Sequence, residues 1–155
     1  MSTVMEFIDV DVPVSRAYNQ WTQFETFPQF MEGVERIDQL TETTNHWVTS
    51  IAGVKREFDT EITEQHPDLR IAWRAIGGQD HAGVVTFHRL GASTTRVTVQ
   101  MDYEAHGLVE NLGDKLGFVD RRVKADLERF KQFIESQGHE TGAWRGEVEP
   151  PPTAG

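Results

Sequence analysis

The sequence predicts an α+β domain in which one curved antiparallel β-sheet of about seven strands wraps around a long C-terminal α-helix. Apolar and polar residues alternate in short runs between residues 33 and 103, and turn residues separate these runs. From Leu108 to Ile134 the apolar residues are instead spaced by three or four positions, which is typical of an amphipathic helix. The apolar face of the sheet and the apolar stripe of the helix must bury each other.

The chain is expected to begin with a strand and two short helices. Apolar residues alternate along Val4–Val12, and Pro13 ends this strand. Ser15 can cap the first helix. Pro28 must lie in the first turn of the second helix or break it. The apolar residues of the two helices are Ala17, Tyr18 and Trp21, followed by Phe24, Phe27 and Phe30.

Six further strands are predicted in the middle of the chain. Short turns join them, which favours an antiparallel meander. The expected strands are Val34–Leu40, His46–Ala52, Lys55–Glu64, Leu69–Ile76, Gly83–Leu90 and Thr95–Tyr103.

The C-terminal helix and a tail complete the expected organisation. Gly113 and Gly117 each cost about 1 kcal/mol against alanine, so the helix is expected to bend or to begin late near them. The domain is predicted at 1–138. Residues 139–155 lack periodicity and contain three consecutive prolines, so we expect a disordered tail. Trp144 is the residue of this tail that could dock onto the domain.

Composition excludes several classes of function. The chain has 155 residues, with 15 Lys and Arg against 25 Asp and Glu, which gives a net charge of −10. Such acidity disfavours nucleic acid as a partner. The absence of cysteine excludes disulfides and thiol nucleophiles. No apolar run approaches the roughly 18 residues of a membrane span. We expect a cytoplasmic monomer or homodimer with no cofactor and no stable membrane insertion.

Several motifs follow one another in a characteristic order. They are Phe27–Val34, Arg56–Phe58, Arg70–Trp73, Gly83–Phe87 and Asp126–Lys131. With these motifs, positions 4–137 resemble the polyketide cyclase/dehydrase and coenzyme-Q-binding-protein branch of the START-related (SRPBCC) superfamily. The resemblance implies a helix-grip fold with a deep cavity between the sheet and the long helix.

Aromatic side chains on separate strands are candidates for the wall of this cavity. Their alternative role is an ordinary core, because aromatic residues dominate core burial. We expect a cavity of roughly 300 Å³ or more. The predicted ligand-binding residues are Trp47, Phe58, Trp73, Val85, Phe87, Met101 and Tyr103 of the sheet, and Leu112, Leu116 and Val119 of the helix.

Candidates for catalysis are few. Tyr103 could act as a general acid from the end of the last strand. Arg56 and Arg74 could reach the cavity mouth, but the sequence favours exposed cross-strand ion pairs, such as Arg74 with Glu61 or Asp59. No nucleophile motif occurs, and the six histidines lack the spacing of metal ligands, so we expect surface histidines and no metal site.

Three functions remain open at this stage. The first is binding of a hydrophobic small molecule such as a polyketide, an isoprenoid quinone or a lipid. The second is a polyketide aromatase/cyclase or dehydratase, which would need convergent acid and base groups in the cavity. The third is an interaction module, which would show a large exposed apolar patch.

Overall fold

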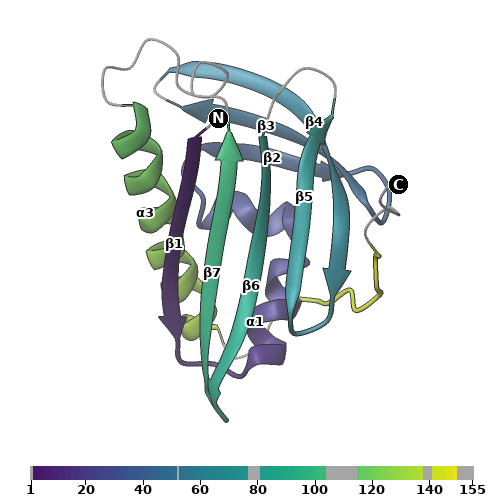
Figure 1. The fold of residues 1–155 in the computed structure, drawn as a ribbon, viewed down its shortest axis with the longest axis vertical. Helices are drawn as coiled ribbons and strands as arrows, with labels where there is room; N and C mark the ends of the chain where they lie inside the picture. Colours follow the sequence, from purple (N-terminus) through teal and green to yellow (C-terminus); the bar gives the residue numbers. More distant parts are fainter. Residues whose placement is uncertain (1, 52, 77–80, 104–114, 138–140, 150–155) are drawn as a thin grey trace.

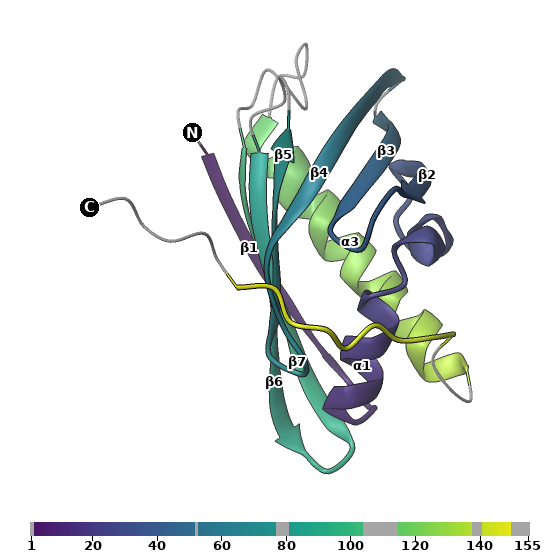
Figure 2. The same cartoon turned by 90° about the vertical axis from the view of Figure 1, so that its right-hand side faces the viewer.

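Seven strands form one antiparallel sheet that curves around a long helix (Figures 1 and 2). The structure, a computed structural model, describes residues 2–51, 53–76, 81–103, 115–137 and 141–149. The sheet order β1-β7-β6-β5-β4-β3-β2 confirms the predicted α+β helix-grip class. The elements are β1 (Ser2–Val10), α1 (Val14–Trp21), η1 (Phe24–Gln29), β2 (Val34–Gln39), β3 (Thr44–Ile51), β4 (Val54–His66), β5 (Arg70–Ile76), β6 (His81–Gly91), β7 (Thr94–Tyr103) and α3 (Lys115–Ser136).

The sheet is a meander to which the first strand is added at one edge. Each strand from β2 to β6 pairs with the strand that follows it in sequence, and β1 pairs with β7. The register shifts between Ile62 and Glu64 on β4 and between Arg89 and Gly91 on β6. Such irregularities bend a strand and increase its twist. They account for part of the curvature that lets the sheet enclose α3.

The tightly packed core fills one end of the space between sheet and helix. Tyr18 of α1 and Phe130 of α3 are completely buried. The Trp21 ring meets the Phe130 ring edge-on, with centroids 4.8 Å apart. Phe27 and Phe30 pack beside them from η1 and its C-terminal end. The C-terminal half of α3 is therefore held against α1 and η1, which leaves its N-terminal half to face the open part of the sheet.

Both short helices differ locally from the prediction. Pro13, not Ser15, is the N-cap of α1, because the Pro13 carbonyl accepts the Arg16 and Ala17 N–H groups at 3.1 and 3.2 Å. Pro28 lies near the end of η1, and not in its first turn. A 3₁₀ helix of six residues tolerates this position because few of its N–H groups need a partner inside the helix.

The long helix is described from Lys115, so the predicted start near Leu108 lies outside the described residues. Its buried stripe includes Leu127, Phe130 and Ile134, as the spacing predicts. None of the helices in the described part of the chain is long and apolar enough to cross a membrane.

The C-terminal segment 141–149 is docked, which differs from the expected disordered tail (Figure 2). Val148 pairs with Gln65 of β4 through two backbone hydrogen bonds of 2.8 and 2.9 Å. The backbone N–H of Trp144 donates a hydrogen bond to the Thr22 hydroxyl at 3.0 Å. Sequence periodicity does not reveal this docking, because an extended segment is held here by individual polar contacts.

Arg145 adds the strongest side-chain contacts of this segment. Its guanidinium donates to the Asn19 amide oxygen at 2.6 Å and pairs with Asp68 at 2.8 Å. It also lies over the Tyr18 ring, 5.4 Å from the centroid. The segment thereby joins α1 to the turn that follows β4.

Candidate ligand-binding cavity

A cavity of about 190 Å³ lies between the concave face of the sheet and α3, closed at one end by α1 and η1. It is smaller than the roughly 300 Å³ expected, because large aromatic rings project into it. The residues of the sheet that line it are Asn45, Trp47, Thr49, Phe58, Thr60, Ile62, Ile71, Trp73, His81, Val99 and Met101. The helical residues that line it are Trp21, Phe24, Phe27, Met31, Arg122, Val123, Asp126 and Leu127.

Four of the predicted ligand-binding residues meet at this cavity. They are Trp47, Phe58, Trp73 and Met101. The structure instead places Val85 and Phe87 in the packed core. The Phe87 ring meets the Tyr18 ring at 5.4 Å, beneath α1. Alternation predicts correctly which face of the sheet these residues occupy, but it does not predict how far along the sheet the cavity extends.

The other predicted residues cannot be placed in the same way. Leu112 lies outside the described residues. Leu116 and Val119 belong to α3 and Tyr103 ends β7, but their side chains are outside the described part of the structure.

An aromatic wall forms one side of the cavity. Trp47 of β3 and Phe58 of β4 are cross-strand partners whose rings stack at 6.0 Å with an angle of 11°. The Trp47 indole N–H donates to the Thr60 hydroxyl at 2.9 Å, which fixes the orientation of the ring. The Trp73 ring lies over Gly83, where a Cβ atom would come within 2.4 Å of it. The wall is therefore flat and rigid.

Two of the polar side chains that the sheet contributes to the cavity have a buried atom without a hydrogen-bond partner among the described residues. Asn45 is 1% exposed. Neither the Asn45 Oδ1 atom nor the His81 Nδ1 atom has a hydrogen-bond partner among the described residues. The His81 ring meets the Phe58 ring edge-on at 5.1 Å. Burial lowers the pKa of His81 to about 4, so its imidazole is neutral near pH 7.

The position of His81 corrects the expectation that the histidines lie on the surface. His81 begins β6, two residues before the predicted start of this strand. Extending the predicted strand by these two residues would have placed His81 on the same face as Val85 and Phe87. His88, seven positions later, is exposed on the opposite face, as the sequence predicts.

The helical side of the cavity contributes a half-buried carboxyl group. Asp126 of α3 bonds to the Arg129 guanidinium and accepts the Glu32 N–H at 3.4 Å. Burial is the largest influence on the pKa of Asp126 and raises it. Arg122, one turn earlier, pairs with Glu32 at 3.3 Å. His81 and Asp126 are thus two titratable groups that line one cavity from opposite elements.

The two arginines predicted near the cavity mouth differ in their surroundings. Arg74 forms an ion pair with Glu61 at 3.0 Å, and its side chain is 61% exposed. Arg74 therefore forms the exposed cross-strand ion pair that was the alternative to a place at the cavity mouth. Arg56 is half-buried on β4 as the cross-strand partner of Thr49, and it is not among the residues that line the cavity.

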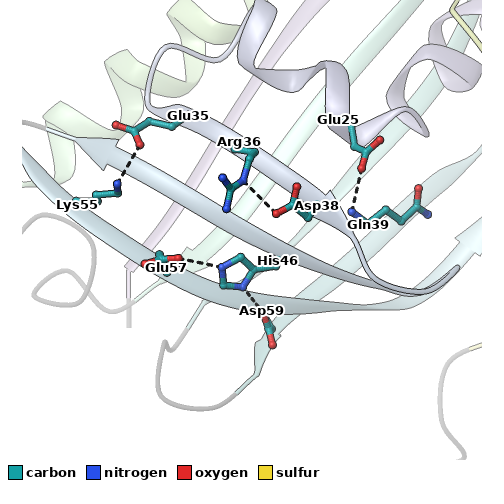
Figure 3. Close-up of polar contacts among 9 residues, drawn as sticks. All are labelled: Glu25, Glu35, Arg36, Asp38, Gln39, His46, Lys55, Glu57 and Asp59. Atoms are coloured by element: carbon teal, nitrogen blue, oxygen red, sulfur yellow. Dashed lines mark hydrogen bonds and ion pairs between the residues drawn. The ribbon is translucent and has the colours of Figure 1, made fainter.

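His46 of β3 forms a small polar network with two carboxylates of the neighbouring strand β4 (Figure 3). It lies between Asp59, at 2.6 Å, and Glu57, at 3.2 Å. These carboxylates raise the pKa of His46, with the hydrogen bond to Asp59 as the largest cause. None of these three residues lines the cavity, so the network is separate from it.

One group of potential metal ligands is found among the described residues. Ligand atoms of His66, Glu147 and Glu149 lie within 4.8 Å of one another, where the C-terminal segment meets β4. The group lies outside the cavity, and both glutamates are exposed. Exposed carboxylates gather in this way without a metal, so the group does not indicate a metal centre.

Comparisons with known proteins agree with the geometry of the fold and the cavity. Residues 10–132 match the protein family described as polyketide cyclase/dehydrase and lipid transport. An uncharacterized 17.2 kDa protein of Streptomyces lincolnensis is 64% identical over 149 residues, which cover 96% of this chain and 99% of the relative.

Solved structures share the fold at low sequence identity. A START superfamily protein from Mycobacterium smegmatis has a TM-score of 0.72 at 14% identity, covering 86% of this chain and 97% of that protein. The Zhui aromatase/cyclase of a Streptomyces species has a TM-score of 0.72 at 16% identity, covering 92% of this chain and 99% of that protein. Similarity at this level shows the fold alone.

Proposed function

Because the chain belongs to the polyketide cyclase/dehydrase and lipid transport family, we propose that it binds a hydrophobic small molecule in the cavity between the sheet and α3. The observation that carries the proposal is the cavity itself, about 190 Å³ with mainly aromatic and aliphatic walls. A water molecule occupies about 30 Å³ in the liquid, so a cavity of about 190 Å³ has room for on the order of six water-sized groups. This size suits a molecule of one or two rings, or one segment of a polyketide, isoprenoid quinone or lipid.

Binding in such a cavity has a clear physical basis. Side chains that line an empty apolar space lack packing partners on one side, and a ligand that fills the space restores these contacts. The flat stack of Trp47 and Phe58 favours a planar ligand, since aromatic rings pack well in offset-stacked and edge-on arrangements. We further propose a monomer or homodimer in the cytoplasm, a location with which the absence of cysteine is compatible.

The test fills the cavity and measures binding of an uncharged fluorescent probe of two fused rings, 1-aminonaphthalene. Val123 of α3 lines the cavity, whereas Glu128 is exposed on the same helix. We expect saturable binding to the wild-type protein and to the control Glu128→Trp, and affinity weaker by about tenfold or more in Val123→Trp, equivalent to about 1.4 kcal/mol.

Equal binding to both tryptophan variants, or no saturable binding to the wild type, would contradict the proposal. Near-UV circular dichroism shows whether Val123→Trp is folded. If it is not, Thr49→Phe fills the cavity from the sheet instead.

A second candidate function is polyketide aromatase/cyclase or dehydratase activity, and one observation favours it. His81 and Asp126 line the same cavity and could assist proton transfer. Turnover of a poly-β-keto substrate that falls about 10²-fold in His81→Phe or Asp126→Asn would support this function. Tyr103→Phe belongs in the same assay, because Tyr103 stays a candidate at the end of β7. Absence of turnover by the wild-type protein would favour binding alone.

A further inference from the structure

We propose that Asn45 and His81 are the two polar ends of the binding site and that they select a planar aromatic molecule carrying hydroxyl groups. This inference rests on the proposed function, because it specifies the chemistry of the ligand in the same cavity. It depends on three observations: two unpartnered polar atoms, their separation, and the flat aromatic wall between them.

Asn45 supplies the first polar end. Its side chain lines the cavity from β3, yet it is 1% exposed and its Oδ1 has no partner among the described residues. The hydroxyl of Thr60, its cross-strand partner, accepts the Trp47 indole N–H and makes no hydrogen bond to this amide oxygen. A buried amide oxygen without a partner lowers stability, and an apolar residue of similar shape would avoid this loss. The amide is therefore better explained by a ligand than by the fold.

His81 supplies the second polar end. Its Nδ1 is buried without a partner among the described residues, and its ring packs edge-on against Phe58. Because burial keeps the imidazole neutral, it carries one N–H donor and one acceptor nitrogen. Nδ1 has either role, depending on the tautomer.

The two ends are separated along the aromatic wall. Asn45 is the cross-strand partner of Thr60, and His81 packs against Phe58. Thr60 and Phe58 are two positions apart on β4, which corresponds to roughly 7 Å. Trp47 stacks on Phe58 in this interval. A molecule of two fused rings with a polar group at each end matches the arrangement.

A hydroxyl group fits both ends because it can donate and accept a hydrogen bond. It can pair with either terminal atom of the Asn45 amide and with either tautomer of His81. The terminal torsions of both side chains have broad preferences, so the polar atoms can turn toward a ligand.

The experiment compares matched naphthalenes by calorimetric titration of the full chain. The ligands are naphthalene, 2,6-dihydroxynaphthalene and 2,6-dimethoxynaphthalene, of which the last can accept but not donate. The variants are Asn45→Leu and His81→Phe, with Thr86→Val as the control. Thr86 lies on β6 but is not among the residues that line the cavity.

We expect the wild-type protein to bind the diol about tenfold or more tightly than naphthalene, as one or two satisfied hydrogen bonds would produce. The dimethoxy compound should show less of this gain. Asn45→Leu and His81→Phe should each bind the diol about tenfold more weakly than the wild-type protein does, and each should bind naphthalene with unchanged affinity. Thr86→Val should keep the preference for the diol.

The outcomes separate the two proposals. If none of the naphthalenes binds, the proposed function fails. If naphthalene binds and the diol binds no more tightly, this inference is overturned and the proposed function stands. A preference for the diol that persists in both variants overturns the assignment to Asn45 and His81. Their thermal midpoints should equal or exceed that of the wild type, and a fall in both would assign the two residues to the fold instead. Asn45→Ala and His81→Leu repeat the test if the first variants do not fold.

Discussion

Replacing Gly83 by alanine should displace the Trp73 ring that forms part of the cavity wall. The two residues are cross-strand partners on β6 and β5. A Cβ at position 83 would lie 2.4 Å from Cζ2 and 2.5 Å from Cη2 of the indole. Carbon atoms in ordinary contact are about 3.5–4.0 Å apart. The ring must therefore move by about 1 Å, and because it lines the cavity, this movement also changes the binding site.

The size of the effect follows from two opposing contributions to the free energy of unfolding. Forcing extra volume into a packed site costs about 1–3 kcal/mol. Alanine in a strand is favoured over glycine by about 0.5–1 kcal/mol, because glycine loses more backbone freedom on folding. Gly83→Ala should thus destabilise the wild-type protein by about 0–2.5 kcal/mol. In a Trp73→Leu background the clash is absent, and the same substitution should stabilise by about 0.5–1 kcal/mol.

Urea unfolding of the four proteins of this double-mutant cycle measures the difference. We expect a coupling energy of about 1–3 kcal/mol between positions 83 and 73. Gly91→Ala is the matched control, because nothing lies within 4 Å of a Cβ at that position of the same strand. An equal cost of Gly83→Ala in both backgrounds would refute the reasoning, since the clash with the indole could not then be its cause.

Three further predictions concern the tail and the two unusual histidines. Deleting 141–155 should lower the free energy of unfolding in urea by at least about 1 kcal/mol, because two backbone hydrogen bonds to β4 each contribute about 0.5–1.5 kcal/mol. Deleting only 150–155 is the control, and equal stability of both deletions would contradict the docking. Asp59 raises the pKa of His46, so the contribution of this pair to stability is complete below about pH 6.5. This contribution is lost as the pH rises through the folded-state pKa, which lowers the thermal midpoint. His46→Gln should remove this decline. Burial lowers the pKa of His81 to about 4, so the unfolded chain takes up the proton first and stability falls as the pH drops from about 6.5 toward 4. His81→Phe should flatten that fall, and an unchanged pH profile would show that the imidazole is not buried as described.

The exposed apolar side chains do not favour the third function, an interaction module. Among the described residues, the large exposed ones are spread over several elements: Met5, Phe7, Leu40, Leu69, Ile76 and Leu90. The Phe7 ring is covered in part by the Arg96 guanidinium, 4.5 Å from its centroid. Apolar residues exposed singly are normal on a folded protein and do not mark a partner surface.

Local periodicity predicted much of the fold because each residue of a strand or helix depends mainly on its near neighbours. Alternation assigned Trp47, Phe58 and Trp73 to the inward face, where they line the cavity. The same rule assigned Phe87 to the inward face, but it could not predict whether Phe87 lines the cavity or belongs to the packed core, where the structure places it. That distinction depends on where α1 packs, which alternation within a strand does not describe.

The remaining features depend on contacts between distant parts of the chain. Asn45 and His81 are 36 positions apart in sequence, and they line one cavity only because the sheet curves. The tail has no periodic pattern, yet it docks because α1 and the strand β4 present polar groups that match its backbone.

The sequence by itself determined the family, the order of the strands and helices, and the inward face of the sheet, because composition and period-2 or helical spacing are local properties. The tertiary structure decided the size and extent of the cavity, the burial of His81 and the path of residues 141–149. Each of these depends on how elements far apart in the chain pack together. Such packing sets the space and the hydrogen-bond partners left to each side chain, and no local pattern records it.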